Sequence, residues 1–234
     1  MVKVGVSMLG FKKMFAELLP ELKAAGADMA YWQVMDESFV PMQNDTLRSQ
    51  GPNTISSANQ VRGGQKGYLP FYTHLMIGGP IARVQSYARA GSDIIVTHYE
   101  ADPSPAVAYS IRELDRSPGI AVKPGTDVSV LDINEKEDRA AHLRYVDHVL
   151  VMCVDPDHAG SCISGGFENR NDEVNRLADM RNSHSLEYEI AVVGHMNPEN
   201  ARIMREAGAD IIIAGSFVRN ASDYKEAIRQ LRGD

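Results

Sequence analysis

Three segments of this chain repeat one pattern, in which an amphipathic helix ends at a glycine and a short apolar strand follows an aspartate. The segments are LKAAGADMAYWQV (22–34), YARAGSDIIVTHYE (87–100) and MREAGADIIIAGS (204–216). Glycine readily takes the left-handed conformation that ends many helices, so Gly26, Gly91 and Gly208 are predicted helix ends. The repeat indicates a chain that alternates helix and strand.

The spacing of these segments fits a barrel of βα units. The intervals between the three glycines are close to two and four times the ~30 residues of one unit, and the chain has room for about eight units. The predicted fold is α/β, a (β/α)8 TIM barrel formed by residues 1–234 as a single domain. Eight runs are apolar throughout, as strands covered on both faces should be: 2–7, 29–34, 71–76, 93–98, 119–123, 148–154, 189–193 and 210–215.

Residues 42–69 interrupt this rhythm with a polar, glycine-rich sequence. The segment is too long for a tight barrel loop, and residues 52–62 within it can form a helix. The rest is interpreted as a mobile lid, as an interface with another subunit, or as a solvated connection without a role. We expect the protein to form a homo-oligomer.

Composition narrows the possible partners. Twenty-four Lys and Arg against 31 Asp and Glu give a net charge of -7, which disfavours nucleic acid and anionic membranes as partners. The N-terminus lacks the apolar core of a secretory signal, so a cytoplasmic protein without membrane contact is expected. Cys153 and Cys162 form no metal-binding spacing, and neither a zinc site nor a disulfide framework is predicted.

Functional residues are expected at the carboxyl ends of the strands, where the active sites of TIM barrels lie. This rule selects polar, sulfur-containing and small residues from all eight strands. They are Ser7, Gln33, Met35, Asp36, His74, Met76, His98, Glu100, Lys123, Met152, Asp155, Gly194, His195, Gly215 and Ser216.

The motifs at these strand ends resemble those of the ribulose-phosphate 3-epimerase family, in the same order and spacing. They are SML (7–9), VMDESFVP (34–41), HLM (74–76), THYEA (97–101), KPGT (123–126), VLVMCVDP (149–156), NPENA (197–201) and AGS (214–216). The resemblance implies a TIM barrel of the ribulose-phosphate-binding type. It also implies inversion of the carbon next to the ketone of a phosphorylated ketose. One aspartate would remove the proton, a second would return it from the other face, and a divalent metal would stabilise the enediolate.

The chain departs from the family pattern at the residues that carry this chemistry. The family's His-x-Asp-x-Met-Asp reads YWQVMD over residues 31–36, so Tyr31 replaces a metal ligand and Gln33 replaces a catalytic aspartate. Val193 stands where the resemblance places the second aspartate. Of the four metal ligands that the resemblance implies, only His74 remains, so we predict no bound metal and no other cofactor.

The remaining residues are assigned three roles. Catalytic candidates are His74, Gln33, His98, Glu100 and His195, because imidazoles titrate near neutrality and can transfer protons without a metal. The resemblance implies substrate binding by Ser7, Met35, Asp36, Met76 and Met152. It implies phosphate binding by Gly160, Gly194, Gly215 and Ser216. Because these residues have no side chain or a small one, backbone N–H groups can approach an anion.

The main hypothesis is an isomerase or epimerase that acts on a phosphorylated ketose without the family's metal site. The alternatives are a genuine ribulose-phosphate 3-epimerase and a non-catalytic phosphosugar-binding protein. Packing alone is a further interpretation for His98 and for the three methionines, and Asp36 is consistent with a conserved loop shape rather than with chemistry. Trp32 is predicted to face the surrounding helices as ordinary core.

Overall fold

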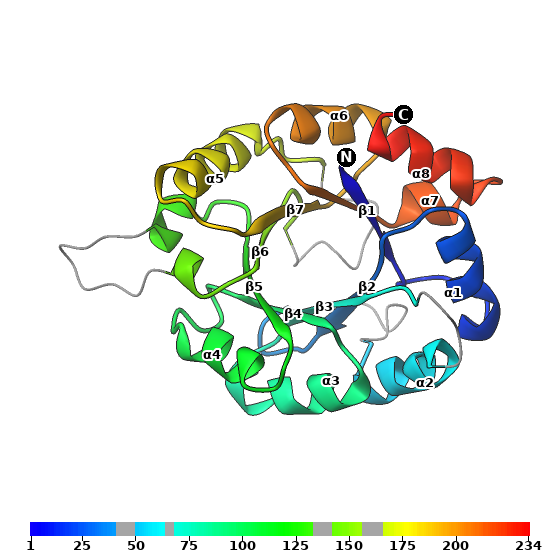
Figure 1. Ribbon diagram of the computed structural model, residues 1–234, viewed down its shortest axis with the longest axis horizontal. Helices are drawn as coiled ribbons and strands as arrows, with labels where there is room; N and C mark the ends of the chain where they lie inside the picture. Colours follow the sequence, from blue (N-terminus) through cyan, green and yellow to red (C-terminus); the bar gives the residue numbers. More distant parts are fainter. Residues whose placement is uncertain (41–49, 64–67, 133–141, 156–165) are drawn as a thin grey trace.

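Eight parallel strands close into a barrel in chain order, surrounded by a ring of helices (Figure 1). The computed structural model describes residues 1–40, 50–63, 68–132, 142–155 and 166–234. The predicted (β/α)8 fold is confirmed, and each predicted strand is found within two residues of its expected bounds. The strands are β1 Lys3–Ser7, β2 Met29–Met35, β3 Phe71–Met76, β4 Ile94–His98, β5 Ser117–Val122, β6 His148–Met152, β7 Glu189–Val193 and β8 Ile211–Ala214.

The helices follow the strands around the outside of the barrel. They are α1 Phe15–Ala24, α2 Pro52–Arg62, α3 Val84–Ala90, α4 Ala106–Arg112, α5 Asn171–Ser183, α6 Pro198–Glu206, α7 Ser216–Arg219 and α8 Tyr224–Arg232, with 3-10 turns η1 Pro80–Ala82, η2 Val128–Leu131 and η3 His142–Arg144. Helix α2 confirms the helix expected at 52–62, whereas residues 41–49 and 64–67 of the polar segment lie outside the described residues. No helix in the described ranges is both long and apolar enough to cross a lipid bilayer.

The repeated segments build the same junction three times at the amino-terminal ends of the strands. Gly26, Gly91 and Gly208 have φ angles of 93°, 108° and 106°, which confirms the predicted left-handed helix ends. The aspartate that follows each glycine accepts a hydrogen bond from the first residues of a neighbouring strand. The pairs are Val4 N to Asp28 at 2.7 Å, Phe71 N to Asp93 at 2.8 Å, and Ile190 N to Asp210 at 2.8 Å.

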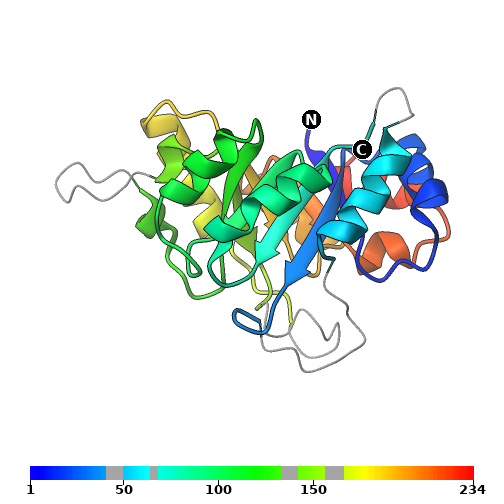
Figure 2. The same cartoon turned by 90° about the horizontal axis from the view of Figure 1, so that it is seen from below.

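Each of these aspartates also binds an arginine from the last turn of a helix. Arg232 of α8 lies 2.7 Å from Asp28, Arg181 of α5 lies 2.5 Å from Asp210, and Arg62 of α2 pairs with Asp93. A cation is favoured in the last turn of a helix because the carbonyl end of the helix dipole is negative. The junctions therefore tie the inner barrel to the outer ring on the face where both termini lie, opposite the strand arrowheads (Figure 2).

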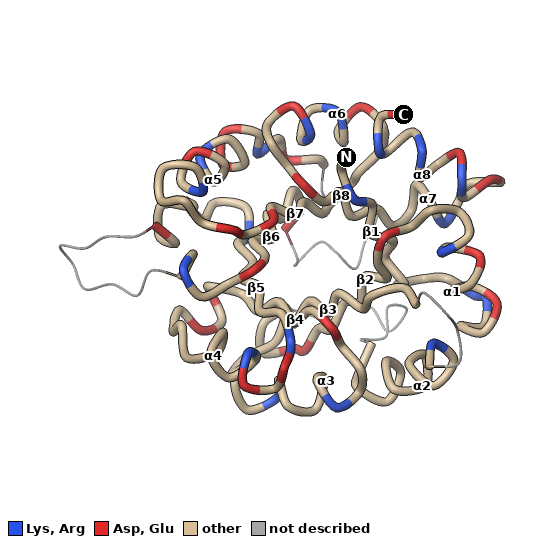
Figure 3. Tube along the Cα trace, viewed as in Figure 1, with Lys and Arg blue, Asp and Glu red and all other residues tan. Residues whose placement is uncertain are grey.

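Apolar side chains fill both the space between barrel and helices and the barrel interior. Trp32 is fully buried and packs edge-on against Phe15 and Phe71, with ring centroids 5.3 and 5.1 Å apart, so its predicted place in the outer core is confirmed. The interior holds a second cluster that includes Tyr31 and Tyr72. Charged residues of both signs are interspersed around the helical ring (Figure 3).

Loss of one junction carboxylate is predicted to destabilise the fold. Asp210→Asn removes the charge that pairs with Arg181 and weakens the acceptor of the Ile190 N–H, so the free energy of unfolding should fall by about 1–3 kcal/mol. Urea denaturation followed by circular dichroism measures this change. Asp179→Asn, on the exposed side of α5, is the matched control and should stay within about 0.5 kcal/mol of the parent protein. Equal stabilities of the two variants would contradict the role of the junction.

Candidate functional site

A pocket of about 110 Å³ lies at the carboxyl ends of β1, β2, β6, β7 and β8. Seven predicted site residues line it, and no described lining residue is an aspartate or a glutamate. The only basic side chains among the described lining residues are His195 and Arg219. The described residues that line the pocket are Ser7, Leu9, Tyr31, Gln33, Met152, Val154, Val193, Gly194, His195, Met196, Ile213, Gly215, Ser216 and Arg219.

A series of hydrogen-bonded side chains runs from this pocket across the inner side of β2, β3 and β4. The hydroxyl of Tyr31 lies 2.6 Å from Nδ1 of His74, and Nε2 of His74 lies 2.9 Å from Nε2 of His98. Nδ1 of His98 lies 2.9 Å from a carboxylate oxygen of Glu100. Each partner lies one strand further round the barrel, except Glu100, which follows β4. The structure thus brings together three predicted catalytic residues and adds Tyr31.

Burial sets the protonation of this series. It lowers the pKa of His74, with a further lowering from His98, and it lowers the pKa of His98 against the opposing effect of Glu100. Burial raises the pKa of Tyr31, to which Tyr72 adds. Burial also favours protonation of Glu100, but hydrogen bonds from His98, Thr126 and the Lys123 N–H outweigh it and lower the pKa of Glu100 to about 2. At neutral pH both imidazoles and the phenol are neutral, whereas Glu100 is a carboxylate.

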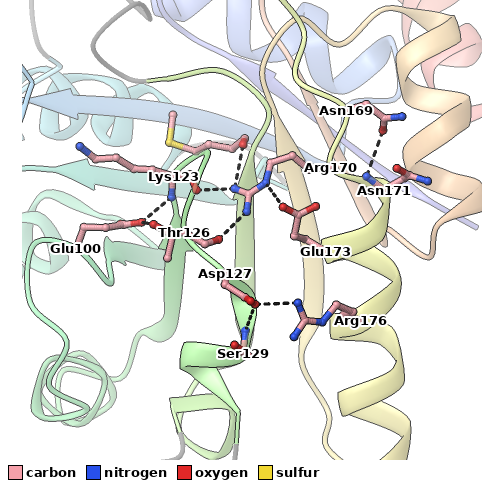
Figure 4. A network of polar contacts seen from close by, with 11 residues as sticks. Glu100, Lys123, Thr126, Asp127, Ser129, Asn169, Arg170, Asn171, Glu173 and Arg176 are labelled. Atoms are coloured by element: carbon pink, nitrogen blue, oxygen red, sulfur yellow. Dashed lines mark hydrogen bonds and ion pairs between the residues drawn. The ribbon is translucent and has the colours of Figure 1, made fainter.

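The loop after β5 fixes Glu100 in place (Figure 4). One carboxylate oxygen accepts hydrogen bonds from the backbone N–H of Lys123 at 2.8 Å and from the Thr126 hydroxyl at 2.6 Å. Arg170, only 1% exposed, donates to the carbonyl oxygens of Lys123 at 2.6 Å and Thr126 at 2.8 Å and pairs with Glu173 at 3.0 Å. Sequence reasoning missed Arg170, because an arginine just before a helix carries no signal of burial.

Ser7 and Gln33 form a second polar contact inside the pocket. The Ser7 hydroxyl donates to the amide oxygen of Gln33 at 2.8 Å. The backbone N–H of Gln33 donates to the side chain of Gln50 at 2.9 Å, and Gln50 is buried although it belongs to the polar segment. With its amide oxygen engaged, Gln33 has its amide nitrogen to offer as a hydrogen-bond donor.

The other predicted substrate-binding residues are three methionines and Asp36, and none of them takes part in this contact. Met35, Met76 and Met152 pack together in one apolar cluster at the mouth, and only Met152 of the three lines the pocket. Asp36 accepts hydrogen bonds from Ser38 and Gly78 and pairs with Arg83 at 3.0 Å. Its contacts shape the loop after β2, in agreement with the loop interpretation.

Three of the four predicted phosphate-binding residues share one side of the pocket. Gly194, Gly215 and Ser216 line it, whereas Gly160 lies outside the described residues. Gly194 has a φ angle of 117°, and a Cβ added there would lie 2.8 Å from a side-chain carbon of Val154, so the position requires glycine. Arg219, which sequence reasoning missed, lines the same pocket and donates to the Leu9 carbonyl at 2.8 Å. The feature of the sequence that could have indicated Arg219 is its position as a basic residue three places after Ser216.

His195 is placed differently from the other two histidine candidates. It is exposed at the rim of the pocket, has a φ angle of 47°, and offers its carbonyl oxygen to Asn200 at 2.8 Å. His74 and His98 are fully buried behind Tyr31. The structure therefore does not bring His195 into the buried series.

The donor set at the mouth does not fit the divalent cation that the resemblance implies. Tyr31 and Gln33 offer neutral oxygen atoms, and Val193 offers no donor. Both ring nitrogens of His74 lie within hydrogen-bond distance of other side chains. Across the described ranges, no group of three or more His, Cys, Asp or Glu side chains is arranged to hold a metal ion.

Comparison with known proteins gives one family match and several similar relatives. The model of the ribulose-phosphate 3 epimerase family matches residues 3–219. Ribulose-phosphate 3-epimerase of Bacillus subtilis is 34% identical over 237 residues, covering 100% of this chain and 99% of that protein. The chloroplastic ribulose-5-phosphate-3-epimerase of Arabidopsis thaliana is 33% identical and covers 93% of this chain and 72% of its own.

Solved structures with the same fold include a 3-hexulose-6-phosphate synthase from Salmonella typhimurium, with a TM-score of 0.68 and 14% identity, covering 99% of this chain and 97% of that one. A phosphoribosyl anthranilate isomerase from Thermus thermophilus gives a TM-score of 0.62 with 13% identity, covering 99% and 96%. At these identities the likeness establishes the shared barrel alone.

The stability contributed by Glu100 is predicted to depend on pH. Because the pKa of Glu100 in the folded protein is about 2, below its ordinary value of 4.5, its carboxylate stabilises the fold above pH 4.5, and this contribution is lost as the pH falls toward 2. Glu100→Gln should therefore lower the free energy of unfolding more at about pH 7 than at about pH 3. Urea denaturation at both pH values measures the difference. Glu187→Gln, at an exposed position, controls for the loss of one charge, and a pH-independent effect of Glu100→Gln would contradict the prediction.

Proposed function

Because this chain belongs to the ribulose-phosphate 3-epimerase family, we propose that it is an isomerase that moves a proton on a phosphorylated ketose by means of its own side chains, without the family's metal site. One observation carries the proposal: the hydrogen-bonded series of His74, His98 and Glu100 ends at Tyr31 in the wall of the pocket. The proposed substrate class agrees with the names of the two relatives, which are ribulose-phosphate epimerases.

The phosphate group of the sugar is proposed to bind on the β7–β8 side of the pocket. Gly194, Gly215 and Ser216 lie together there, and small residues allow backbone N–H groups to approach an anion. Arg219 adds a positive charge to the same wall, and no carboxylate among the described lining residues opposes it. Attraction between Arg219 and the phosphate, without repulsion from a described carboxylate, favours binding of the phosphate on this side of the pocket.

The sugar is then proposed to place its carbonyl group near Gln33 and Tyr31. Removal of a proton next to a carbonyl puts negative charge on the carbonyl oxygen, and a positioned hydrogen-bond donor stabilises that charge. The amide nitrogen of Gln33 can serve as this donor, because the Ser7 hydroxyl already binds the amide oxygen. The imidazoles of His74 and His98 can take up the proton, since both are neutral at neutral pH.

A second candidate function is phosphosugar binding without catalysis. The observation in its favour is that Gln33 and Val193 line the pocket where the resemblance places the two catalytic aspartates. The genuine epimerase reaction is the third candidate, favoured by the 34% identity to the Bacillus subtilis enzyme. These candidates differ in whether the substrate loses a carbon-bound proton and in which product forms.

Proton exchange without metal is the first prediction from this proposal. D-Ribulose 5-phosphate incubated in D₂O with the EDTA-treated protein should lose the signal of the proton next to its ketone, because histidine-based transfer needs no cation. Proton NMR follows this loss and identifies the product. Xylulose 5-phosphate as the product would identify the genuine epimerase. Binding of the sugar phosphate without proton exchange would support the non-catalytic function. Activity that EDTA abolishes and a divalent cation restores would contradict the metal-free proposal.

Arg219 is predicted to contribute to binding of the phosphate group. Arg219→Met removes a charged hydrogen bond of about 1.5–3 kcal/mol, so the dissociation constant for D-ribulose 5-phosphate should rise about tenfold to a hundredfold. Thermal-shift titration measures it, since a ligand at a hundred times its dissociation constant adds about 2.7 kcal/mol of stability. Arg202→Met, in a surface pair with Glu206 on α6, is the matched control. Equal affinities of the two variants would place the phosphate elsewhere.

A further inference from the structure

We propose that the hydroxyl of Tyr31 is the group that exchanges a proton with the bound sugar phosphate, and that His74, His98 and Glu100 form a proton relay behind it. The inference rests on the proposed function and names the catalytic residue within it. Tyr31 lines the pocket, whereas His74, His98 and Glu100 are absent from its described lining. Any proton that passes between the pocket and the two histidines along the hydrogen bonds of this series therefore passes through the phenol.

The hydrogen bonds of the series have one consistent direction. A carboxylate can only accept, so His98 donates from Nδ1 to Glu100 at 2.9 Å. A neutral imidazole carries one N–H, so Nε2 of His98 accepts, and the proton between the two rings belongs to Nε2 of His74 at 2.9 Å. Nδ1 of His74 then accepts from the Tyr31 hydroxyl at 2.6 Å. Both rings are fully buried, and every ring nitrogen has its partner within this series.

This direction prepares the Tyr31 oxygen to receive a proton from the pocket. Its own hydrogen points to His74, so its lone pairs are available to a carbon-bound proton of the substrate. As that proton moves to the Tyr31 oxygen, the phenol proton moves to Nδ1 of His74, and the Nε2 proton of His74 moves to Nε2 of His98. The electron pair of the broken C–H bond forms the enediolate, whose oxygen carries the negative charge.

The same step leaves a balanced charge on the protein side. His98 becomes a cation in contact with the carboxylate of Glu100, at the 2.9 Å distance of the resting hydrogen bond. Tyr31 and His74 each receive one proton and pass one on, so both end neutral and no phenolate forms. Reversal of the transfers returns a proton to the enediolate. No oxidant, reductant or metal enters the balance.

In this proposal a proton-transfer group stands at a position where the resemblance places a metal ligand. Tyr31 stands where the resemblance places one of those ligands, and His74 stands where it places another. Their mutual contact at 2.6 Å occupies Nδ1 of His74, and Nε2 of the same ring contacts His98. The relay takes up the proton in place of the family's first aspartate, and the amide nitrogen of Gln33 donates to the enediolate oxygen that a cation would otherwise stabilise.

Tyr72 offers an internal control for this role. Its ring lies 5.8 Å from that of Tyr31, and it is equally buried. Unlike Tyr31, its hydroxyl has no hydrogen-bond partner among the described residues, and it does not line the pocket. Tyr31→Phe and Tyr72→Phe therefore remove the same atom from neighbouring rings, but only the first change cuts the relay.

The test measures exchange of the proton next to the ketone of D-ribulose 5-phosphate in D₂O. Tyr31→Phe should lower the exchange rate about 10²- to 10⁴-fold, with affinity for the probe kept within about threefold, because the phenol acts on the reacting carbon rather than on binding. Tyr72→Phe should exchange at close to the parental rate. A Tyr31→Phe protein that exchanges as fast as Tyr72→Phe would overturn the relay and leave the proposed isomerase standing.

A spectroscopic readout tests the relay separately from activity. In protein labelled with ¹⁵N at histidine, His98 should carry its proton on Nδ1 and His74 on Nε2, with assignments from the His98→Phe and His74→Phe variants. The opposite tautomers, or a cationic ring at neutral pH in the free protein, would overturn the relay whatever the exchange rate. A parent protein that binds the probe but exchanges no proton would overturn both the relay and the isomerase and leave phosphosugar binding.

Discussion

The carboxylate of Glu100 determines the order of the polar groups at the mouth of the barrel. It is held by two donors from the β5 loop, and that loop is held in turn by the buried guanidinium of Arg170 (Figure 4). Because Glu100 can only accept, it fixes the proton on His98, and each later partner in the series follows from that first choice. The charge of Glu100, after β4, thus sets the direction in which the Tyr31 hydroxyl on β2 donates its hydrogen bond.

The fold was largely predictable because its signals are local. Uniformly apolar runs marked the strands, and the glycine of each repeated segment marked a helix end that the structure confirms by its φ angle. The aspartate of each repeat was noticed only as the lead into a strand. Its arginine partner comes from a helix far along the chain, as with Asp28 and Arg232, and no local pattern encodes such a pair.

The candidate site was predictable in its members but not in its connections. His74, His98 and Glu100 were expected at the mouth from their strand ends, yet Tyr31 was noted only as a missing ligand. Tyr31 is paired in register with Tyr72 but contacts His74, two residues further along β3. Because the strands tilt relative to the barrel axis, side chains at the same height along that axis belong to residues that are not paired in register. This offset appears only once the barrel has closed, which is why sequence spacing did not reveal it.

The three arginine–aspartate junctions lie at the amino-terminal ends of the strands, whereas the pocket lies at their carboxyl ends. The contacts that hold helices to strands and the candidate site thus lie at opposite ends of the barrel. Tyr31, Gln33 and Val193 all lie at the pocket end, so their side chains take no part in the three junctions. A substitution in the pocket and a substitution in a junction should therefore act on stability independently, because the two sites share no partner.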